Sequence, residues 1–210
     1  MAQCGNACTV GSIEPKLNEI KVKGFHMGYA QAKLTGSEYL AWEASQAERH
    51  MFVAGEVFSM AGGTAEHNRS AFKAAMALER HLAGTPCKTF IGDMRLKVQA
   101  ADAYFYPDVV VTCDTVDISD PKISTIVAPK LVIEVLSPST VAYDRGQKFA
   151  AYRTLPSLQE YVLIDPESKT LEVFRKNTAG IWELHPSTDL TTNLRFESVD
   201  LTIKLEAFFE

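Results

Sequence analysis

The spacing of apolar residues predicts three helices. The stretch TGSEYLAWEASQA begins with Thr35 and Glu38, which have the spacing of a capping box, so a helix is expected to open there. Residues 65–82 carry apolar side chains at helical intervals, and a glycine and a proline end this pattern shortly afterwards. A third helical segment is expected from about residue 141 to residue 155.

Short apolar runs between these segments predict strands. Two short strands are expected within RHMFVAGEVFSMAGG, broken near Ala54 and Gly55. The other expected strands are 87–98, 103–114, 130–137, 160–165, 170–176, AGIWELH and LTIKL, the last followed by a short helical end. Residues 115–129 are expected to form a long loop.

This order of elements predicts an α/β (α+β) fold. A mixed β-sheet forms the core, helices flank it, and hairpins are added at both ends. Residues 35–210 are expected to form a single domain. Residues 1–34 show no sustained period and are expected to be a partly flexible N-terminal extension.

One acidic residue interrupts the most apolar of these runs. In KLVIEVLSPST, residues 130–140, the side chains from Leu131 to Leu136 are branched and apolar except for Glu134. Such a run is typical of a buried central strand. An ionised carboxylate buried without a partner costs several kcal/mol or more. Glu134 is therefore expected either to have a structural partner or to hold a cation that the chain itself does not supply.

A second acid begins the valine run YPDVVV. Alternation along a strand puts Asp108 and Val110 on one face, and Val132, Glu134 and Leu136 share a face of the later strand. If the two strands are neighbours, the two carboxylates converge, and a proton or a divalent cation must offset their repulsion. Oxygen ligands of this kind suit Mg²⁺ or Mn²⁺. The alternative is that Asp108 is a turn residue and Glu134 pairs with a core arginine or lysine.

The helix after the Glu134 strand adds a basic group. Asp144, Lys148 and Tyr152 follow one another at intervals of four and so share one helix face. Since this helix must fold back over the sheet, it could bring Lys148 toward the carboxylates. The alternative is an Asp144–Lys148 ion pair on a solvated face.

Composition and charge exclude few classes of protein. The chain has 210 residues and a net charge of −5, so no global basic field attracts nucleic acid; this counts against a DNA-coating protein but does not exclude a nuclease. No stretch approaches the roughly 20 apolar residues of a membrane span, and the N-terminus lacks the layout of a signal peptide. A cytoplasmic protein is expected. No C-x-x-C pair occurs, so a structural zinc site is not expected. Given the length of the chain and its core, the four cysteines are expected to be reduced thiols, with Cys87 and Cys113 as buried apolar side chains.

Several motifs together resemble a known family. The combination of Y-P-D, L-V-I-E-V-L-S-P-S-T, D-x-x-x-K and E-Y-V-L-I-D looks like the Uma-type family of restriction endonucleases, formerly a domain of unknown function, in the PD-(D/E)XK nuclease superfamily. The resemblance runs from about Met27 to the C-terminus, and residues 106–165 are its specific part. The segment G-E-V-F-S-M-A-G-G-x-x-x-H is similar to the family's entry region.

The resemblance implies a restriction-endonuclease-like fold and Mg²⁺- or Mn²⁺-dependent hydrolysis of phosphodiester bonds. Asp108 and Glu134 match the two acids of the motif, and the carbonyl of Val135 would complete the metal ligands. The superfamily's usual lysine, two residues after the second acid, is Leu136 here. The family offers Lys148 as its replacement.

Three further residues are candidates for supporting roles. Glu56 and His67 lie in the matching entry region, and Asp144 precedes Lys148 by one helical turn. His67 could equally be a helix-surface histidine. The implied partners are nucleic acid, with DNA favoured, and a second copy of the chain in a homodimer. The alternative function is a catalytically weak or inactive nuclease-like protein that binds nucleic acid or acts in assembly, which Leu136 and the acidic net charge favour.

Overall fold

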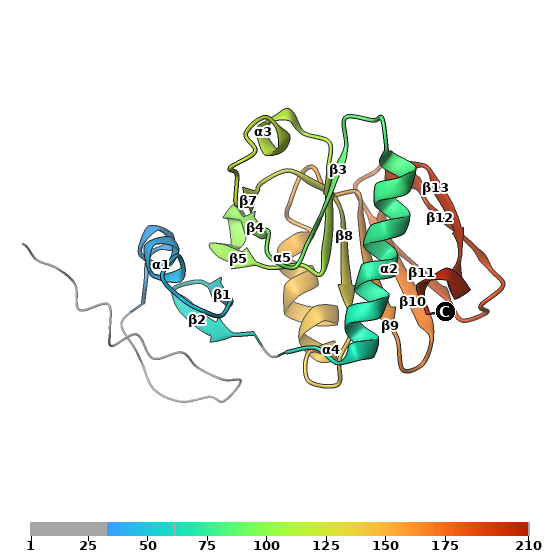
Figure 1. The fold of residues 1–210 in the computed structure, drawn as a ribbon, viewed down its shortest axis with the longest axis horizontal. Coiled ribbons are helices and arrows are strands. Elements are labelled where there is room, and N and C mark those ends of the chain that lie inside the picture. The colour runs from blue at the N-terminus through green and yellow to red at the C-terminus, as the bar shows by residue number, and fades with distance from the viewer. Residues whose placement is uncertain (1–32, 61, 210) are drawn as a thin grey trace, which may run out of the picture.

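A computed structural model describes residues 33–60 and 62–209. Its central feature is a six-stranded sheet in the order β11-β10-β9-β8-β6-β3 (Figure 1). Strands β8 and β9 are parallel, and the other neighbours are antiparallel. The strands are β3 (Lys88–Ile91), β6 (Val109–Thr112), β8 (Pro129–Val135), β9 (Glu160–Asp165), β10 (Thr170–Lys176) and β11 (Trp182–Ser187).

Two smaller sheets accompany it. A five-stranded sheet has the order β2-β1-β5-β4-β7, and a C-terminal hairpin pairs β12 with β13. These strands are β1 (His50–Val53), β2 (Glu56–Ser59), β4 (Arg95–Val98), β5 (Ala103–Phe105), β7 (Thr125–Ile126), β12 (Asn193–Phe196) and β13 (Leu201–Lys204). Ala54 and Gly55, which join β1 to β2, both have positive φ, as a tight hairpin turn requires.

The helices begin where the sequence predicts. Thr35 and Glu38 form the expected capping box at the start of α1 (Gly36–Glu43). The long helix α2 spans Ala65–Leu82, and the Thr64 side chain caps it by accepting the His67 N–H. The remaining helical segments are α3 (Thr115–Ile118), α4 (Val141–Tyr143), η3 (Asp144–Lys148), α5 (Phe149–Tyr152), η2 (Gln99–Ala101), η4 (Glu197–Val199) and η5 (Leu205–Phe208).

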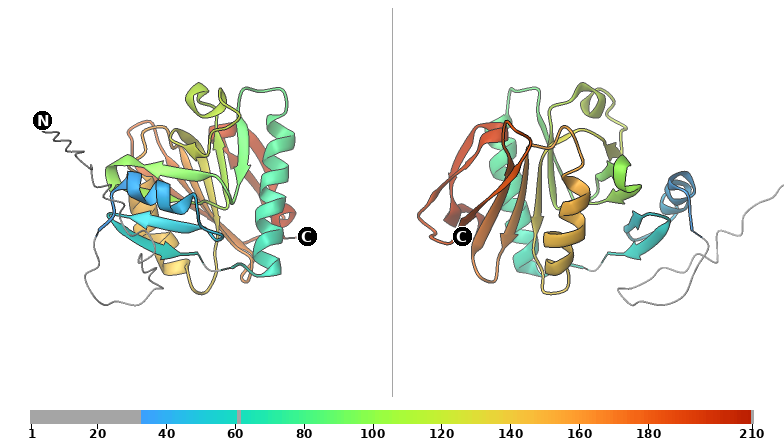
Figure 2. Two further views of the ribbon diagram at one scale, coloured as in Figure 1. Left: turned by 60° about the vertical axis from the view of Figure 1, so that its left-hand side comes forward. Right: turned by 180° about the vertical axis from the view of Figure 1, so that it is seen from behind.

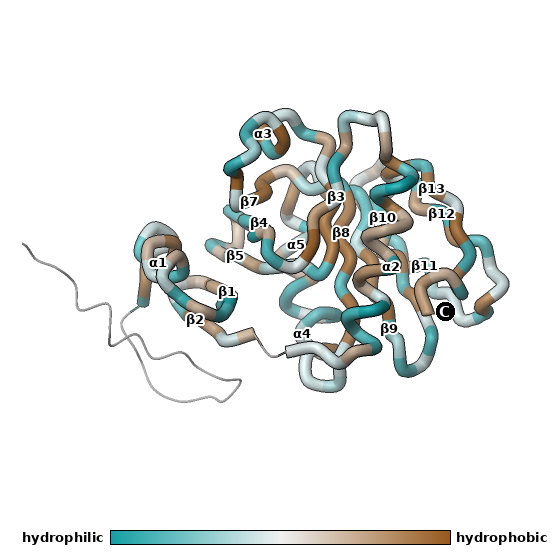
Figure 3. Tube along the Cα trace, in the orientation of Figure 1, coloured by the Kyte–Doolittle hydropathy of each residue, from teal (hydrophilic) through white to brown (hydrophobic). Residues whose placement is uncertain are grey.

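The elements pack in layers around the six-stranded sheet. One core lies between this sheet and a layer formed by α2, the C-terminal hairpin and η5. A second core lies on the opposite face, under α5 and the five-stranded sheet, and a third joins that smaller sheet to α1. Figure 2 shows α2 and α5 on opposite sides of the sheet, and Figure 3 shows apolar residues along β8 at its centre.

Two segments that were each predicted as one strand form two strands in the structure. Residues 87–98 form β3 and β4, which lie in different sheets, because the chain turns at Gly92, where φ is positive. Residues 103–114 likewise divide into β5 and β6. Pro107, which separates them, has no N–H to donate to a strand ladder, so the chain leaves one sheet there and enters the other.

The loop predicted for residues 115–129 is also corrected. It contains the short helix α3 and the strand β7. The buried Asp117 carboxylate organises it by accepting hydrogen bonds from the Thr112 hydroxyl and from the N–H groups of Val127 and Ala128, each at 2.9 Å. The predicted helix from 141 to about 155 forms as α4, η3 and α5 in continuous succession, with a π-helical turn at η3.

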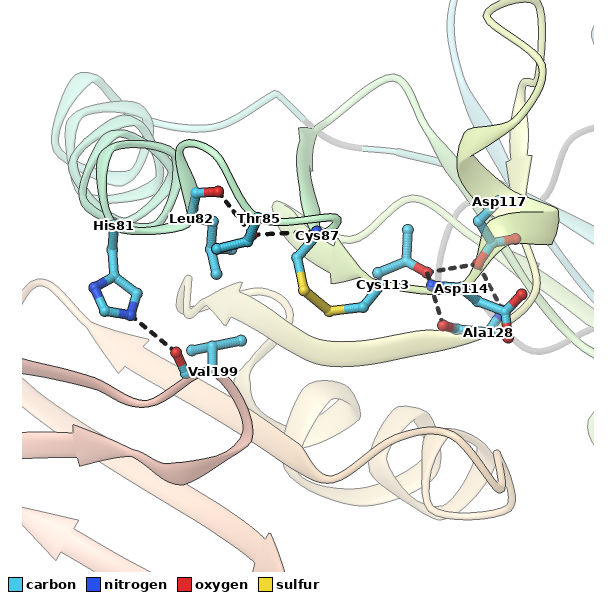
Figure 4. Close-up of a disulfide and its surroundings, with 10 residues drawn as sticks. His81, Leu82, Thr85, Cys87, Cys113, Asp114, Asp117, Ala128 and Val199 are labelled. Atoms are coloured by element: carbon cyan, nitrogen blue, oxygen red, sulfur yellow. Dashed lines mark hydrogen bonds between the residues drawn. A yellow bond between two sulfur atoms is a disulfide. The ribbon is translucent and has the colours of Figure 1, made fainter.

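The expectation of reduced thiols is wrong for Cys87 and Cys113, whereas Cys4 and Cys8 lie outside the described residues. Cys87 and Cys113 form a disulfide, and their Cα atoms lie 4.0 Å apart (Figure 4). Lys88 pairs with Thr112 between β3 and β6, so one residue beyond that pair the two cysteines lie opposite each other. Neither is fully buried. The sequence separation of 26 residues gave no hint of this cross-strand contact.

Other sequence predictions concern segments that the structure does not test. The expected N-terminal extension, residues 1–34, falls almost wholly outside the described residues and stays a prediction. Within the described part of the chain, none of the helices has both the length and the apolar character needed to cross a membrane.

Candidate active site

Strand pairing brings Asp108 and Glu134 to the same point of the sheet. Val109 of β6 pairs with Ile133 of β8 in antiparallel register, and the two acids follow one residue beyond this pair. The Val135 N–H donates to Asp108 Oδ2 at 2.8 Å, which fixes the Asp108 carboxylate across the end of β8. Asp108 keeps 24% of its side chain exposed, whereas Glu134 keeps 4%. The site is therefore a buried acid next to an accessible one.

Glu134 has partners within the chain. The Lys148 ammonium lies 2.8 Å from Glu134 Oε1, and the Tyr152 hydroxyl donates to the same oxygen at 2.9 Å. Lys148 also lies 3.2 Å from Asp144 Oδ1, one helical turn earlier. Lys148 therefore pairs with Asp144 and also reaches the buried acid, but the expected alternative of a pair on a solvated face is wrong, because both side chains are buried. The segments η3 and α5 thus place Asp144, Lys148 and Tyr152 against β8.

Burial and charge act in opposite directions on this cluster. Burial raises the pKa of Glu134 to about 8; the Lys148 charge opposes the rise, and the carboxylates of Asp108 and Asp144 add to it. Burial alone would lower the pKa of Lys148, but the carboxylates of Glu134 and Asp144 raise it above its ordinary value. Lys148 is therefore held as an ammonium ion among three acids.

His67 reaches the accessible side of the site from the first turn of α2. Its Nε2 lies 3.3 Å from Asp108 Oδ2. The hydrogen bond with Asp108 is the main cause that raises the pKa of His67, burial opposes it, and the main-chain carbonyl of Val135 adds to the rise. The imidazole ring thus faces both Asp108 and the backbone of Val135, so it is part of the site and not a helix-surface histidine.

The other predicted residues fall in different places. Leu136 is 5% exposed and packs in the core under α5, so a lysine at its position would enter an apolar environment. Glu56 begins β2 of the five-stranded sheet, opposite Val53, and not on the strands that carry the two acids.

Two tyrosines complete the site, and the sequence analysis assigned them no role there. Tyr152 binds Glu134, and the Tyr161 hydroxyl donates to the Asp144 carbonyl at 3.1 Å. The interval of four from Lys148 to Tyr152 was a signal for the first. For Tyr161, on β9, nothing in the local sequence distinguishes this contact.

The donor set suits a hard divalent cation. Among the residues that the structure describes, no group of three or more His, Cys, Asp or Glu side chains is arranged to hold a metal ion. Mg²⁺, however, is usually bound through only one or two carboxylates, together with water and phosphate. Asp108, Glu134 and the Val135 carbonyl are such a set, and the three acids of the cluster outnumber its one ammonium. The residues present therefore fit Mg²⁺ or Mn²⁺.

Comparison with known proteins shows the family of the chain. The sequence model of the Uma2 family, described as "Putative restriction endonuclease", matches residues 37–206. Two uncharacterized proteins of Synechocystis sp. are similar: slr1290 is 35% identical over 84% of this chain and 92% of its own length, and sll1609 is 38% identical over 72% and 85%.

A solved structure shares the fold. The crystal structure of a putative nuclease belonging to DUF820 from Anabaena variabilis superimposes with a TM-score of 0.69 at 17% identity, covering 84% of this chain and 97% of that one. The predicted restriction-endonuclease-like fold is confirmed. The family model spans all of the candidate site residues, from Glu56 to Lys148. By its sequence and its fold, the chain belongs to the Uma2 family.

Proposed function

We propose that this protein is a divalent-metal-dependent endonuclease that hydrolyses phosphodiester bonds in nucleic acid, with DNA as the expected substrate. The observation that carries the proposal is the meeting of Asp108, Glu134 and Lys148 at one end of β8. The description of the Uma2 family supports the same reaction. The cytoplasmic location and the homodimeric state expected from the sequence belong to this proposal as well.

The acids and the main chain would hold the cation. Asp108 and Glu134 provide carboxylate oxygens, and Val135 provides a carbonyl oxygen beside them. When bound there, Mg²⁺ or Mn²⁺ supplies positive charge that offsets the phosphate and acidifies a water molecule. The exposed side of Asp108 is where a phosphodiester can approach, since Glu134 is covered by α5.

Lys148 would act as a fixed positive charge. Because its neighbouring carboxylates raise its pKa, it keeps its proton at neutral pH and serves poorly as a general base. An ammonium held in a buried setting can stabilise the negative charge that develops on the phosphate. Tyr152 restrains Glu134 Oε1, and His67 aligns the Asp108 carboxylate from the other side.

The test is cleavage by the purified protein. Supercoiled plasmid, linear duplex DNA, single-stranded DNA and RNA are each incubated with Mg²⁺, Mn²⁺ or EDTA. We expect cleavage of at least one substrate with metal, none in EDTA, and loss of cleavage in Asp108→Asn. Asp114→Asn is the matched control, because Asp114 follows the opposite end of the same strand β6 and caps α3. It should cleave like the wild type.

Two results would contradict the proposal. Equal cleavage by Asp108→Asn would mean that the activity does not come from this site. Metal-dependent retention of nucleic acid on the protein without cleavage of any substrate would support the alternative, a nuclease-like binding protein.

A further inference from the structure

The imidazole ring of His67 lies over the residue that comes one helical turn earlier. Helical side chains lean toward the N-terminus of their helix, so each one covers the turn that precedes it. For His67 that turn begins with Gly63, directly before the Thr64 cap of α2. The N–H of His67 donates to the Thr64 hydroxyl at 3.2 Å, which fixes the backbone that carries the ring.

Gly63 provides the space for this ring. A Cβ atom added to Gly63 would lie 2.9 Å from His67 Nδ1 and 3.2 Å from His67 Cγ, closer than a methyl group and a ring can approach without a shift. The φ angle of Gly63 is not positive, so its backbone does not require a glycine. Gly62 differs, because a Cβ atom there would have no described atom within 4 Å. Of these two neighbouring glycines, only Gly63 is needed for the room that it leaves.

The other ring nitrogen of His67 contacts Asp108. His67 Nε2 lies 3.3 Å from Asp108 Oδ2, and the Val135 N–H donates to the same oxygen at 2.8 Å. Among the residues that the structure describes, no donor is hydrogen-bonded to the second oxygen, Oδ1. Two groups therefore hold Oδ2 in place, and Oδ1 is the oxygen that is left for a cation.

Glu134 shows the same division between its two oxygens. Lys148 and Tyr152 both bond to Oε1, and no residue of the described part of the chain is bonded to Oε2. Each acid thus directs one oxygen to groups of the chain and keeps the other free. Hydrogen bonds that hold a ligand from behind fix its orientation, and their loss weakens metal binding.

We propose that Gly63 positions His67, and through it Asp108, because its missing side chain lets the ring lie where Nε2 meets Oδ2. The ring is confined at both nitrogens, with Nδ1 next to Gly63 and Nε2 next to Asp108. A methyl group at Gly63 must therefore displace the ring relative to Asp108. The carboxylate then keeps only the Val135 N–H and is free to turn. The inference rests on the proposed function, in that Asp108 is a ligand of the cation.

Calorimetric titration with Mn²⁺ measures this effect without a cleavage assay. Gly63→Ala should raise the dissociation constant of Mn²⁺ about tenfold, as substitutions behind a metal ligand do. The matched control Gly62→Ala adds the same methyl group one residue away and should leave the constant unchanged. Circular dichroism in EDTA checks that each variant folds. Equal affinities of Gly63→Ala and the wild type would overturn the proposal.

A double-mutant cycle shows whether Gly63 acts through His67. His67→Ala should itself weaken Mn²⁺ binding. In that background Gly63→Ala should cause no further loss, because the added methyl group then meets no ring. If the two losses add instead, the effect of Gly63 lies in the backbone at the start of α2, and the proposed role is excluded.

Chemical modification of the ring gives a readout that needs neither metal nor activity. His67 is 19% exposed and its nitrogens lie next to Gly63 and Asp108, so diethyl pyrocarbonate should modify it slowly in the wild type. Peptide mass spectrometry should show several-fold faster modification in Gly63→Ala but not in Gly62→Ala, with the exposed His185 as the reference in each sample. An unchanged rate would overturn the positioning by Gly63. A wild type that binds no Mn²⁺ would instead contradict the proposed function, and the modification rates would still decide the role of Gly63.

Discussion

Two buried glutamates lie at opposite ends of the same pair of parallel strands. Glu160 begins β9 beside Leu131, and Glu134 lies near the end of β8 beside Leu163. Glu160 receives Arg175 at 2.8 Å, the N–H groups of Glu197 and Ser198, and the Ser198 hydroxyl. Both of its oxygens are thus bonded to donors, and the contacts tie the sheet to the segment between β12 and β13.

Glu134 has a different environment. Its bonds to Lys148 and Tyr152 both fall on one oxygen, and two other carboxylates lie close enough to raise its pKa. A buried acid surrounded by donors stabilises a fold, whereas one crowded by other acids is retained at a cost. The difference teaches that burial and a cationic partner do not by themselves show that an acid stabilises the fold, because the charge of its other neighbours also counts.

The largest expected effect is on stability. Glu160→Gln should lower the free energy of unfolding by about 3–5 kcal/mol, because it removes a buried carboxylate charge that four donors face and puts an amide donor among them, while Arg175 keeps only the exposed Glu197 carboxylate. Glu134→Gln should leave it equal or higher, because Lys148 keeps Asp144 and the cost of burying an ionisable carboxyl is removed. Urea unfolding in EDTA at pH 7 measures both. Equal losses in the two variants would remove the distinction.

The second effect concerns cleavage. Glu134→Gln should reduce metal-dependent cleavage at least about 100-fold, or about 2.7 kcal/mol in the barrier. Glu160→Gln should cleave at the wild-type rate at a temperature where it remains folded. Initial rates on the substrate found to be cleaved, compared at matched folded fractions, provide the measurement. A Glu160→Gln variant that is folded and inactive would assign catalysis to the wrong glutamate.

The third effect is stabilisation by the metal. Mn²⁺ at ten times its dissociation constant should raise the stability of the wild type by about 1.4 kcal/mol. Glu160→Gln should gain the same increment from its lower starting point, and Glu134→Gln should gain little. Thermal melts with and without Mn²⁺ show which outcome holds. An equal gain in all three proteins would indicate that the cation binds elsewhere.

The smallest expected effect is a change in the free energy of unfolding with pH. Glu134 ordinarily titrates near 4.5, and burial raises its pKa to about 8 in the folded chain. Between these values the folded chain holds a proton that the unfolded chain has lost, so stability decreases as the pH rises; the Lys148 charge, which lowers the pKa of Glu134, reduces this slope. The stability of the wild type relative to Glu134→Gln should therefore fall from pH 5 to pH 8 in EDTA. A difference that stays constant over this range would contradict the cause assigned here.

Local patterns predicted much of the fold. The boundaries of α2, β9 and β10, and the capping box of α1, agree with the structure because each depends on residues within one or two turns. The splits at Gly92 and Pro107 were not predicted. Apolar alternation shows that a segment is extended but not which sheet it joins, and two sheets with similar patterns compete for the same residues.

The sequence by itself identified three charged residues in unusual positions. They are Glu134 within an apolar strand, Asp108 directly before β6, and Lys148 one helical turn after an aspartate. Only the tertiary structure decided which of these side chains contact one another. It paired Lys148 with Glu134, turned His67 toward Asp108, added Tyr161 from another strand and joined Cys87 to Cys113. The physical reason is the distance along the chain. Helical and strand patterns depend on residues a few positions apart, whereas these contacts depend on the order of the strands and on how the helices pack across the sheet.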